Sequence, residues 1–212
     1  MTTLDELLEA NPVIPVVVVE STEDGVNVGK ALLAGGITSA EVTFRTAAAE
    51  SAIAAMSELE GLTVGAGTVI NVDQAKRAIA AGAKFVVSPG LSADVVRYCQ
   101  EQGVPVLPAC TDGSLIMAAL DLGIDTVKFF PATALGGIPT IKALAAPFPQ
   151  VRFVPTGGVS AQNLADFLKV PAVASCGGSW MVKGDLVKNQ DWDEISRLSA
   201  EAQEIAAAAR AN

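Results

Sequence analysis

The chain contains no histidine, the side chain that enzymes most often use as a general base and that proteins most often use as a metal ligand. A catalytic triad built on histidine is therefore excluded. Cysteine is scarce as well, since only Cys99, Cys110 and Cys176 occur and no two of them form a C-x-x-C pair. An odd set of widely spaced cysteines is typical of free thiols in a reducing compartment, and without histidine we expect none to be catalytic.

Basic residues are also few. The 14 lysines and arginines are outnumbered by 23 aspartates and glutamates, which gives a net charge of −9 and a sequence pI near 4.5. Binding to nucleic acid requires clustered cations, and this sequence has no basic run. We therefore expect no nucleic-acid partner. An anionic ligand would have to be held by backbone N–H groups and a few local cations.

Long apolar runs are missing too. The apolar segment 13–19 is far shorter than the roughly 20 residues that a membrane-spanning helix needs. Residues 1–20 contain acids but no Lys or Arg, so they lack the charged start of a signal peptide. These features predict a cytoplasmic protein with no membrane partner. Aromatic residues make up only 5% of the chain, which predicts a mainly aliphatic core.

What the sequence does contain is a regular alternation of apolar strands with alanine-rich amphipathic segments. Several of these segments end in glycine just before the next strand, the signature of a helix-to-strand loop. The pattern predicts one domain over residues 1–212, a (β/α)8 TIM barrel with a short N-terminal helix at 2–10 and a C-terminal helix at 191–210. A doubly wound open sheet is the alternative, but no G-x-G-x-x-G follows the first strand. The predicted strands are 13–19, 39–44, 62–66, 85–87, 104–108, 126–129, 152–156 and 172–175.

Lys128 stands inside the apolar strand 126–129. A lysine buried there loses hydration, which disfavours its charged form, and structural lysines seldom occupy such a place. A neutral amine is a nucleophile that can form a Schiff base with a ketone. Lys84 is the competing lysine, but it stands at the start of its strand, at the end of a barrel that serves stability. The other lysines are predicted to lie on the surface: Lys30, Lys76, Lys142, Lys169, Lys183 and Lys188.

The second predicted strand carries polar residues at alternate positions. Glu41, Thr43 and Arg45 share one face, which we expect to point inward toward the site. A Glu41–Arg45 ion pair without a catalytic role is an alternative, and so is a structural Glu41–Lys128 pair. Thr68 and Pro89 follow the third and fourth strands, where a simple turn would explain each of them equally well.

Paired glycines follow the last two predicted strands. Gly157-Gly158 precedes Val159 and a predicted helix, and Gly177-Gly178 precedes Ser179. Turns after strands 7 and 8 form the usual phosphate site of a TIM barrel. Unhindered N–H groups and a helix N-terminus can hold a dianion without Lys or Arg, which suits an acidic protein. The alternative is that both are simple helix-entry turns.

This combination resembles the bacterial 2-keto-3-deoxy-6-phosphogluconate (KDPG) aldolases, a family that is also described as KDPG/4-hydroxy-2-oxoglutarate aldolases. The matching segments run in order along the chain: EVTFRT (41–46), VGAGTV (64–69), SPG (88–90), VKFFPA (127–132), VRFVPTGGV (151–159) and GGSW (177–180).

The resemblance implies roles for individual residues. Lys128 would be the Schiff-base lysine and Glu41 the general acid and base. Arg45 and Thr68 would hold the pyruvyl carboxylate. Thr156 and Phe130 would line the pyruvyl pocket, with Pro89 packing nearby. The distal phosphate would be bound by Gly157, Gly158, Gly178 and Ser179.

The resemblance also implies a reaction. A class I aldolase of this kind would cleave KDPG to pyruvate and glyceraldehyde 3-phosphate in the Entner–Doudoroff pathway. Its second substrate would be 4-hydroxy-2-oxoglutarate, cleaved to pyruvate and glyoxylate. The family needs no metal or other cofactor and forms homotrimers. Two alternatives use the same anion turns without a Schiff base: a phosphosugar isomerase or epimerase, and a non-catalytic barrel that binds phosphorylated acids.

Overall fold

The computed structural model describes residues 3–211 as an α/β fold in which all paired strands run parallel. The strands are β1 (Val13–Val17), β2 (Ser39–Thr43), β3 (Thr63–Gly67), β4 (Val86–Ser88), β5 (Val106–Pro108), β6 (Thr126–Phe129), β7 (Arg152–Pro155) and β8 (Cys176–Gly178). The helices are α1 (Leu4–Ala10), α2 (Thr22–Ala34), α3 (Ala49–Ser57), α4 (Val72–Ala80), α5 (Ala93–Glu101), α6 (Gly113–Asp121), α7 (Gly137–Ala145), α8 (Leu164–Leu168), α9 (Gly184–Lys188) and α10 (Trp192–Arg210), with a 3-10 turn at Trp180–Val182.

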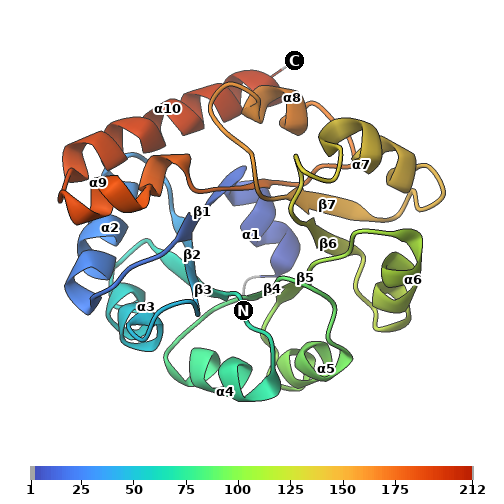
Figure 1. Cartoon of the computed structure of the whole chain (residues 1–212), viewed down its shortest axis with the longest axis horizontal. Helices are drawn as coiled ribbons and strands as arrows, with labels where there is room; N and C mark the ends of the chain where they lie inside the picture. Colours follow the sequence, from blue (N-terminus) through green and yellow to red (C-terminus); the bar gives the residue numbers. More distant parts are fainter. Residues whose placement is uncertain (1–2, 212) are drawn as a thin grey trace.

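The strands form a curled arrangement with helices on its outside (Figure 1). Six of them lie in one sheet in the order β5-β4-β3-β2-β1-β8, while β6 and β7 form a second, two-stranded sheet. Isolated bridges join the two sheets at Ala109–Lys128, Phe153–Val173 and Thr156–Gly177. Because the strands are parallel, their C-terminal ends gather on one side of the molecule, where ligand sites of such sheets are found.

Seven of the eight strands occupy the positions expected from the sequence, to within two residues at either end. The eighth is a correction: we expected it at 172–175, whereas β8 spans Cys176–Gly178. Its register is set by β1, which pairs Val13 with Cys176 and Pro15 with Gly178. The apolar residue Val173 makes only an isolated bridge, to Phe153. The division of the strands between two sheets is a further difference from the single closed sheet that we expected.

Helix α1 closes the N-terminal ends of the strands and appears in the centre of Figure 1. Its Leu7 and Leu8 are buried in a cluster with residues of the strands and of the segment just before β4, namely Ile14, Phe85, Val87, Leu107 and Val154. The helix begins at a capping box, in which the Thr3 hydroxyl accepts from Glu6 N–H and the Glu6 carboxylate accepts from Thr3 N–H. The interior at this end is therefore filled by side chains from α1.

Polar contacts hold α1 against distant parts of the chain. The buried Asn11, just after the helix, accepts from the Thr38 hydroxyl and, through its carbonyl, from the Ser175 hydroxyl. Arg210, at the end of the last helix, donates to the carbonyls of Glu9 and Ala174. The two ends of the described chain are thus fastened to each other.

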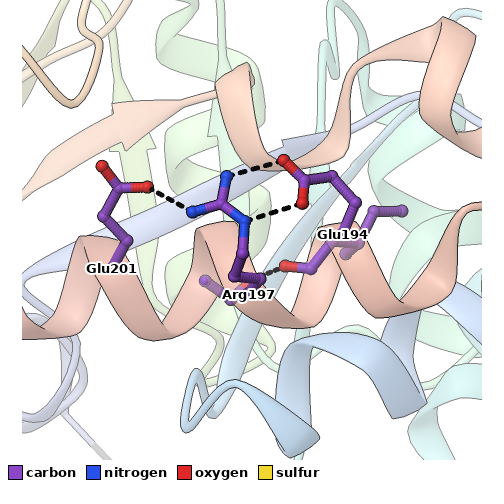
Figure 2. Close-up of polar contacts among 5 residues, drawn as sticks. Glu194, Arg197 and Glu201 are labelled. Carbon is purple, nitrogen blue, oxygen red and sulfur yellow. Dashed lines mark hydrogen bonds and ion pairs between the residues drawn. The ribbon is translucent and has the colours of Figure 1, made fainter.

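Helix α10 packs across α2 and α8. Its inner face buries Ile195, and its outer face carries an ion-pair network (Figure 2). There Arg197 donates two hydrogen bonds to Glu194, at 2.6 and 2.7 Å, and a third to Glu201 at 3.1 Å. Hydrogen bonding to Arg197 holds the pKa of Glu194 below its usual value. Exposed pairs of this kind contribute little to stability, so the buried face holds the helix in place.

Among residues 3–211, no helix is both long and apolar enough to span a membrane.

Replacing Leu8 by alanine should test how much the fold depends on α1. Leu8 is fully buried, so Leu8→Ala should lower the free energy of unfolding by about 2–5 kcal/mol through lost burial and a residual cavity. Urea denaturation measures this difference. Glu9→Ala changes the exposed neighbour on the same helix and should shift stability by less than about 0.5 kcal/mol. Equal effects of the two substitutions would contradict the packing role of Leu8.

The cysteines give a second test. All three are free and buried, and burial raises the pKa of Cys99 to about 11, that of Cys110 to about 12, and that of Cys176 as well. Because the thiolate is the reactive form, the folded protein at pH 8 should resist iodoacetamide, whereas the urea-unfolded chain should take up a label on each cysteine. Intact mass spectrometry counts the labels. Rapid labelling of any cysteine in the native protein would show that its side chain is accessible.

Candidate active site

Lys128 and Glu41 form a buried ion pair between two strands that lie far apart in the sequence. The Nζ atom of Lys128 lies 3.1 Å from Oε1 and 3.3 Å from Oε2 of Glu41. Both side chains are less than a tenth exposed. The sequence placed both residues at the site, and the structure brings them into direct contact. A pair so well removed from water interacts far more strongly than a surface pair.

The register of β2 against β3 makes room for Glu41. Glu41 pairs with Gly65, and Thr43 pairs with Gly67. A Cβ atom on Gly67 would lie 2.2 Å from Oε1 of Glu41, so only glycine fits beside the carboxylate. On the other side of β2, the hydroxyl of Thr43 donates to the carbonyl of Val17 in β1. The glycine-rich end of β3 therefore leaves space for the Glu41 carboxylate, as well as forming a turn.

A pocket of about 450 Å³ opens at the C-terminal ends of β1, β2, β6, β7 and β8. Neither Lys128 nor Glu41 is among its lining residues, and Phe130 connects the pair to it. The aromatic ring of Phe130 lines it, and the ring centre lies 5.6 Å from Nζ of Lys128. The rest of the lining comprises Val16, Val18, Arg45, Thr156, Gly157, Gly158, Val159, Gly177, Gly178, Ser179, Val182, Lys183, Gly184 and Asp185. Six sequence-predicted residues beyond the pair thus meet in one cavity with Phe130: Arg45, Thr156, Gly157, Gly158, Gly178 and Ser179.

The position of Arg45 differs from our expectation, which was that it shares an inward-pointing face of the strand with Glu41. It lies two residues beyond the end of β2, is exposed, and lines the pocket from its rim. Among residues 3–211 it makes no ion pair, so the alternative of a Glu41–Arg45 pair is wrong, and Lys128 is the partner of Glu41. The Arg45 guanidinium is therefore left available for a ligand.

The glycine turns leave backbone donors facing the pocket. Within the described chain, the N–H groups of Gly158 and Ser179 have no hydrogen-bond acceptor. Gly157 and Gly158 have φ values of 93° and 82°, which glycine adopts readily. The turns do not lead straight into long helices as we expected: α8 begins only at Leu164, and a 3-10 turn follows Ser179. The anion-binding capacity of this corner therefore comes from the turns themselves.

Thr68 and Pro89 follow β3 and β4 but do not line this pocket. Pro89 lines a second hollow of about 340 Å³ that also includes Ile70 and Ser88. Thr68 has a φ of 58°, in the left-handed region that β-branched residues rarely adopt. Backbone strain of this kind persists where the surroundings impose it, often at functional sites.

The pocket also contains charged residues that the sequence did not single out. Lys183 and Asp185 lie on its rim, after the 3-10 turn that follows β8. We had predicted Lys183 to be an ordinary surface lysine; it is exposed, but it faces the cavity that holds the glycine turns. In the sequence, the signal that could have placed Lys183 at the site was its position four residues after Ser179. The other five lysines assigned to the surface, and the competing Lys84, are exposed.

Within residues 3–211, no group of three or more Cys, Asp or Glu side chains is arranged so that it could hold a metal ion.

Known proteins resemble this chain along nearly its whole length. A 2-dehydro-3-deoxy-phosphogluconate aldolase of Treponema pallidum is 48% identical over 97% of this chain and 98% of the relative. A KHG/KDPG aldolase of Escherichia coli K12 is 43% identical over 96% of each. The crystal structure of a KDPG aldolase from Legionella pneumophila, with pyruvate captured as a covalent carbinolamine intermediate, superposes with a TM-score of 0.90 at 40% identity, covering 93% of this chain and 97% of that one.

The family model described as KDPG and KHG aldolase matches residues 4–198, which include every site residue named above. The matched segment carries the buried lysine–glutamate pair, the strand-end arginine and both glycine turns. This chain belongs to the KDPG and KHG aldolase family.

Proposed function

We propose that this protein is a class I aldolase that cleaves KDPG to pyruvate and glyceraldehyde 3-phosphate through a Schiff base on Lys128. The same chemistry on 4-hydroxy-2-oxoglutarate would give pyruvate and glyoxylate. The observation that carries the proposal is the buried Lys128–Glu41 pair beside a pocket lined by free N–H groups. Relatives named for both substrates, and a relative that traps pyruvate as a carbinolamine, support it.

The reaction begins with the amine. Nζ of Lys128 hydrogen-bonds to Glu41, so the carboxylate can accept a proton from the ammonium and leave a neutral nucleophile. The amine attacks the 2-keto carbon of the substrate to form a carbinolamine. The protonated Glu41 then gives its proton to the carbinolamine hydroxyl, which leaves as water, and Glu41 is a carboxylate again. The product is a protonated imine, which is an electron sink.

Glu41 then drives cleavage. Its carboxylate removes the proton of the C4 hydroxyl, the C3–C4 bond breaks, and its electron pair moves into the iminium to form an enamine. Glyceraldehyde 3-phosphate leaves as the aldehyde. Glu41, now protonated, returns its proton to C3, and water hydrolyses the resulting iminium ion to release pyruvate and the lysine ammonium, which pairs again with the Glu41 carboxylate. One carboxylate serves each proton transfer because its protonation state alternates.

The remaining residues bind and orient the substrate. Arg45 binds the pyruvyl carboxylate with a bidentate guanidinium, and Thr68 adds its hydroxyl. Phe130 and Thr156 line the pyruvyl side together with Pro89. The distal phosphate accepts hydrogen bonds from the turns that contain Gly157, Gly158, Gly178 and Ser179.

We also propose the assembly in which this site works. The chain forms one domain whose eight strands close into a (β/α)8 barrel, and three copies associate into a homotrimer. The bridges between β5 and β6 and between β7 and β8 support closure, and the exposed side chains of Ile70 and Met117 offer apolar surface for association. The three free, buried thiols agree with a cytoplasmic location.

Replacing Lys128 tests the Schiff base directly. Lys128→Ala should lower the turnover of KDPG by at least about a thousandfold, because the nucleophile is lost. Borohydride reduction in the presence of pyruvate should attach a three-carbon adduct to the unmodified protein and none to the variant. Lys84→Ala, which removes an exposed lysine from the opposite end of the strands, is the control and should leave both results unchanged. An adduct on Lys84 would overturn the assignment.

Glu41→Gln separates proton transfer from imine formation. The amide keeps the shape of the side chain but cannot exchange protons, so turnover should fall by about a hundredfold to ten-thousandfold. Borohydride should still trap pyruvate on the variant. Unmodified protein should exchange the methyl protons of pyruvate for deuterium, which neither a phosphosugar isomerase nor a non-catalytic binding protein would do. Near-full turnover of Glu41→Gln would refute the role given to Glu41.

A further inference from the structure

The rim of the pocket carries two cations on opposite sides of β1. Arg45 follows β2 and Lys183 follows β8, and these two strands flank β1 in the sheet. Val16 and Val18, from and just beyond β1, line the pocket between them. Arg45 therefore lies on the side of Glu41, whereas Lys183 lies on the side of Gly178 and Ser179.

The backbone of Lys183 is held in place although its side chain is exposed. The three preceding residues, Trp180, Met181 and Val182, form a 3-10 turn and are all buried. The Trp180 ring covers Gly178 so closely that a Cβ atom there would lie 1.9 Å from it. The carbonyl of Lys183 accepts from Val187 N–H in α9. The backbone position that carries this pocket-lining side chain is thus fixed relative to the β8 turn.

The ammonium of Lys183 is free to bind a ligand. No ion pair to it occurs among residues 3–211, although Asp185 lines the same rim. The whole chain carries a net charge of −9, which repels an approaching dianion. Backbone N–H groups carry only partial charges. A full positive charge next to the turn therefore adds an attraction that is strongest for the most highly charged ligand.

We propose that Lys183 is a specificity-determining residue, which makes the enzyme favour substrates with a phosphorylated tail over the same carbon skeleton without phosphate. This inference rests on the proposed aldolase function. Lys183 contributes to binding of the phosphate dianion and takes no part in the carbon–carbon cleavage at Lys128. Asp185, of opposite charge on the same rim, weakens that attraction.

The test compares KDPG with 2-keto-3-deoxygluconate, which lacks only the phosphate. Lys183→Gln should raise the KM for KDPG about tenfold, the loss expected for one charge-assisted contact, with kcat changed by less than about twofold. The kinetic constants for 2-keto-3-deoxygluconate should stay the same. Asp185→Asn should lower the KM for KDPG. Added KCl should raise the KM of the unmodified enzyme for KDPG more steeply than that of Lys183→Gln, because salt screens exposed charges.

Lys188→Gln is the matched control, since Lys188 is an exposed lysine on α9 that does not line the pocket. It removes the same charge from the protein and should leave the KM for both substrates unchanged. Inorganic phosphate gives a second readout: its inhibition constant against KDPG should rise about tenfold in Lys183→Gln but not in Lys188→Gln.

An unchanged KM for KDPG in Lys183→Gln would overturn the proposal, and so would equal losses on the two substrates or equal effects of the two lysine variants. These outcomes differ from failure of the aldolase function itself. In that case the unmodified enzyme would neither cleave KDPG nor exchange the methyl protons of pyruvate.

Discussion

The burial of one charged pair is the constraint around which this site is arranged. A lysine and a glutamate withdrawn from water are tolerated because each satisfies the other at 3.1 Å, and either one alone would be an uncompensated buried charge. The pair needs space between strands, which Gly67 provides at the cost of a side chain. It also joins β2 to β6, which belong to different sheets. The interaction proposed to prepare the nucleophile therefore also ties together the two parts of the strand arrangement.

The two ends of the parallel strands have different compositions. At the N-terminal ends, α1 fills the interior with Leu7 and Leu8, and the side chain of the buried Asn11 both donates and accepts a hydrogen bond. At the C-terminal ends, polar groups are left without partners: the Arg45 guanidinium and the N–H groups of Gly158 and Ser179 have none within the described chain. Satisfied groups stabilise a fold, whereas unsatisfied groups that face a cavity can bind a ligand. The free groups that line the pocket thus lie at the C-terminal ends, opposite the packing of α1.

Sequence alone predicted most strands because apolar runs bounded by glycine mark them well. The position predicted for β8 was wrong, because Cys176-Gly177-Gly178 has little strand propensity and the apolar Val173 lies just before it. Pairing with β1 determines where this strand lies. Lys128 and Glu41 could be found because a charged residue in an apolar strand is conspicuous. Lys183 could not, because an exposed lysine in a loop looks like any other until the pocket is known. Arg45 and Gly158 could be assigned to the site because each follows the end of a predicted strand. That the Arg45 guanidinium and the Gly158 N–H group lack partners within the described chain could be seen only in the structure.

The position of α1 has a consequence for the synthesis of the protein. This helix leaves the ribosome before Phe85, Leu107 and Val154, with which it shares a buried cluster, and before Ser175, which hydrogen-bonds to Asn11 just after it. At typical elongation rates, those partners appear roughly four to thirty seconds later. Its leucines stay exposed for that interval, when they can bind a chaperone or another nascent chain. The packing around α1 is thus completed only after the helix itself has been made.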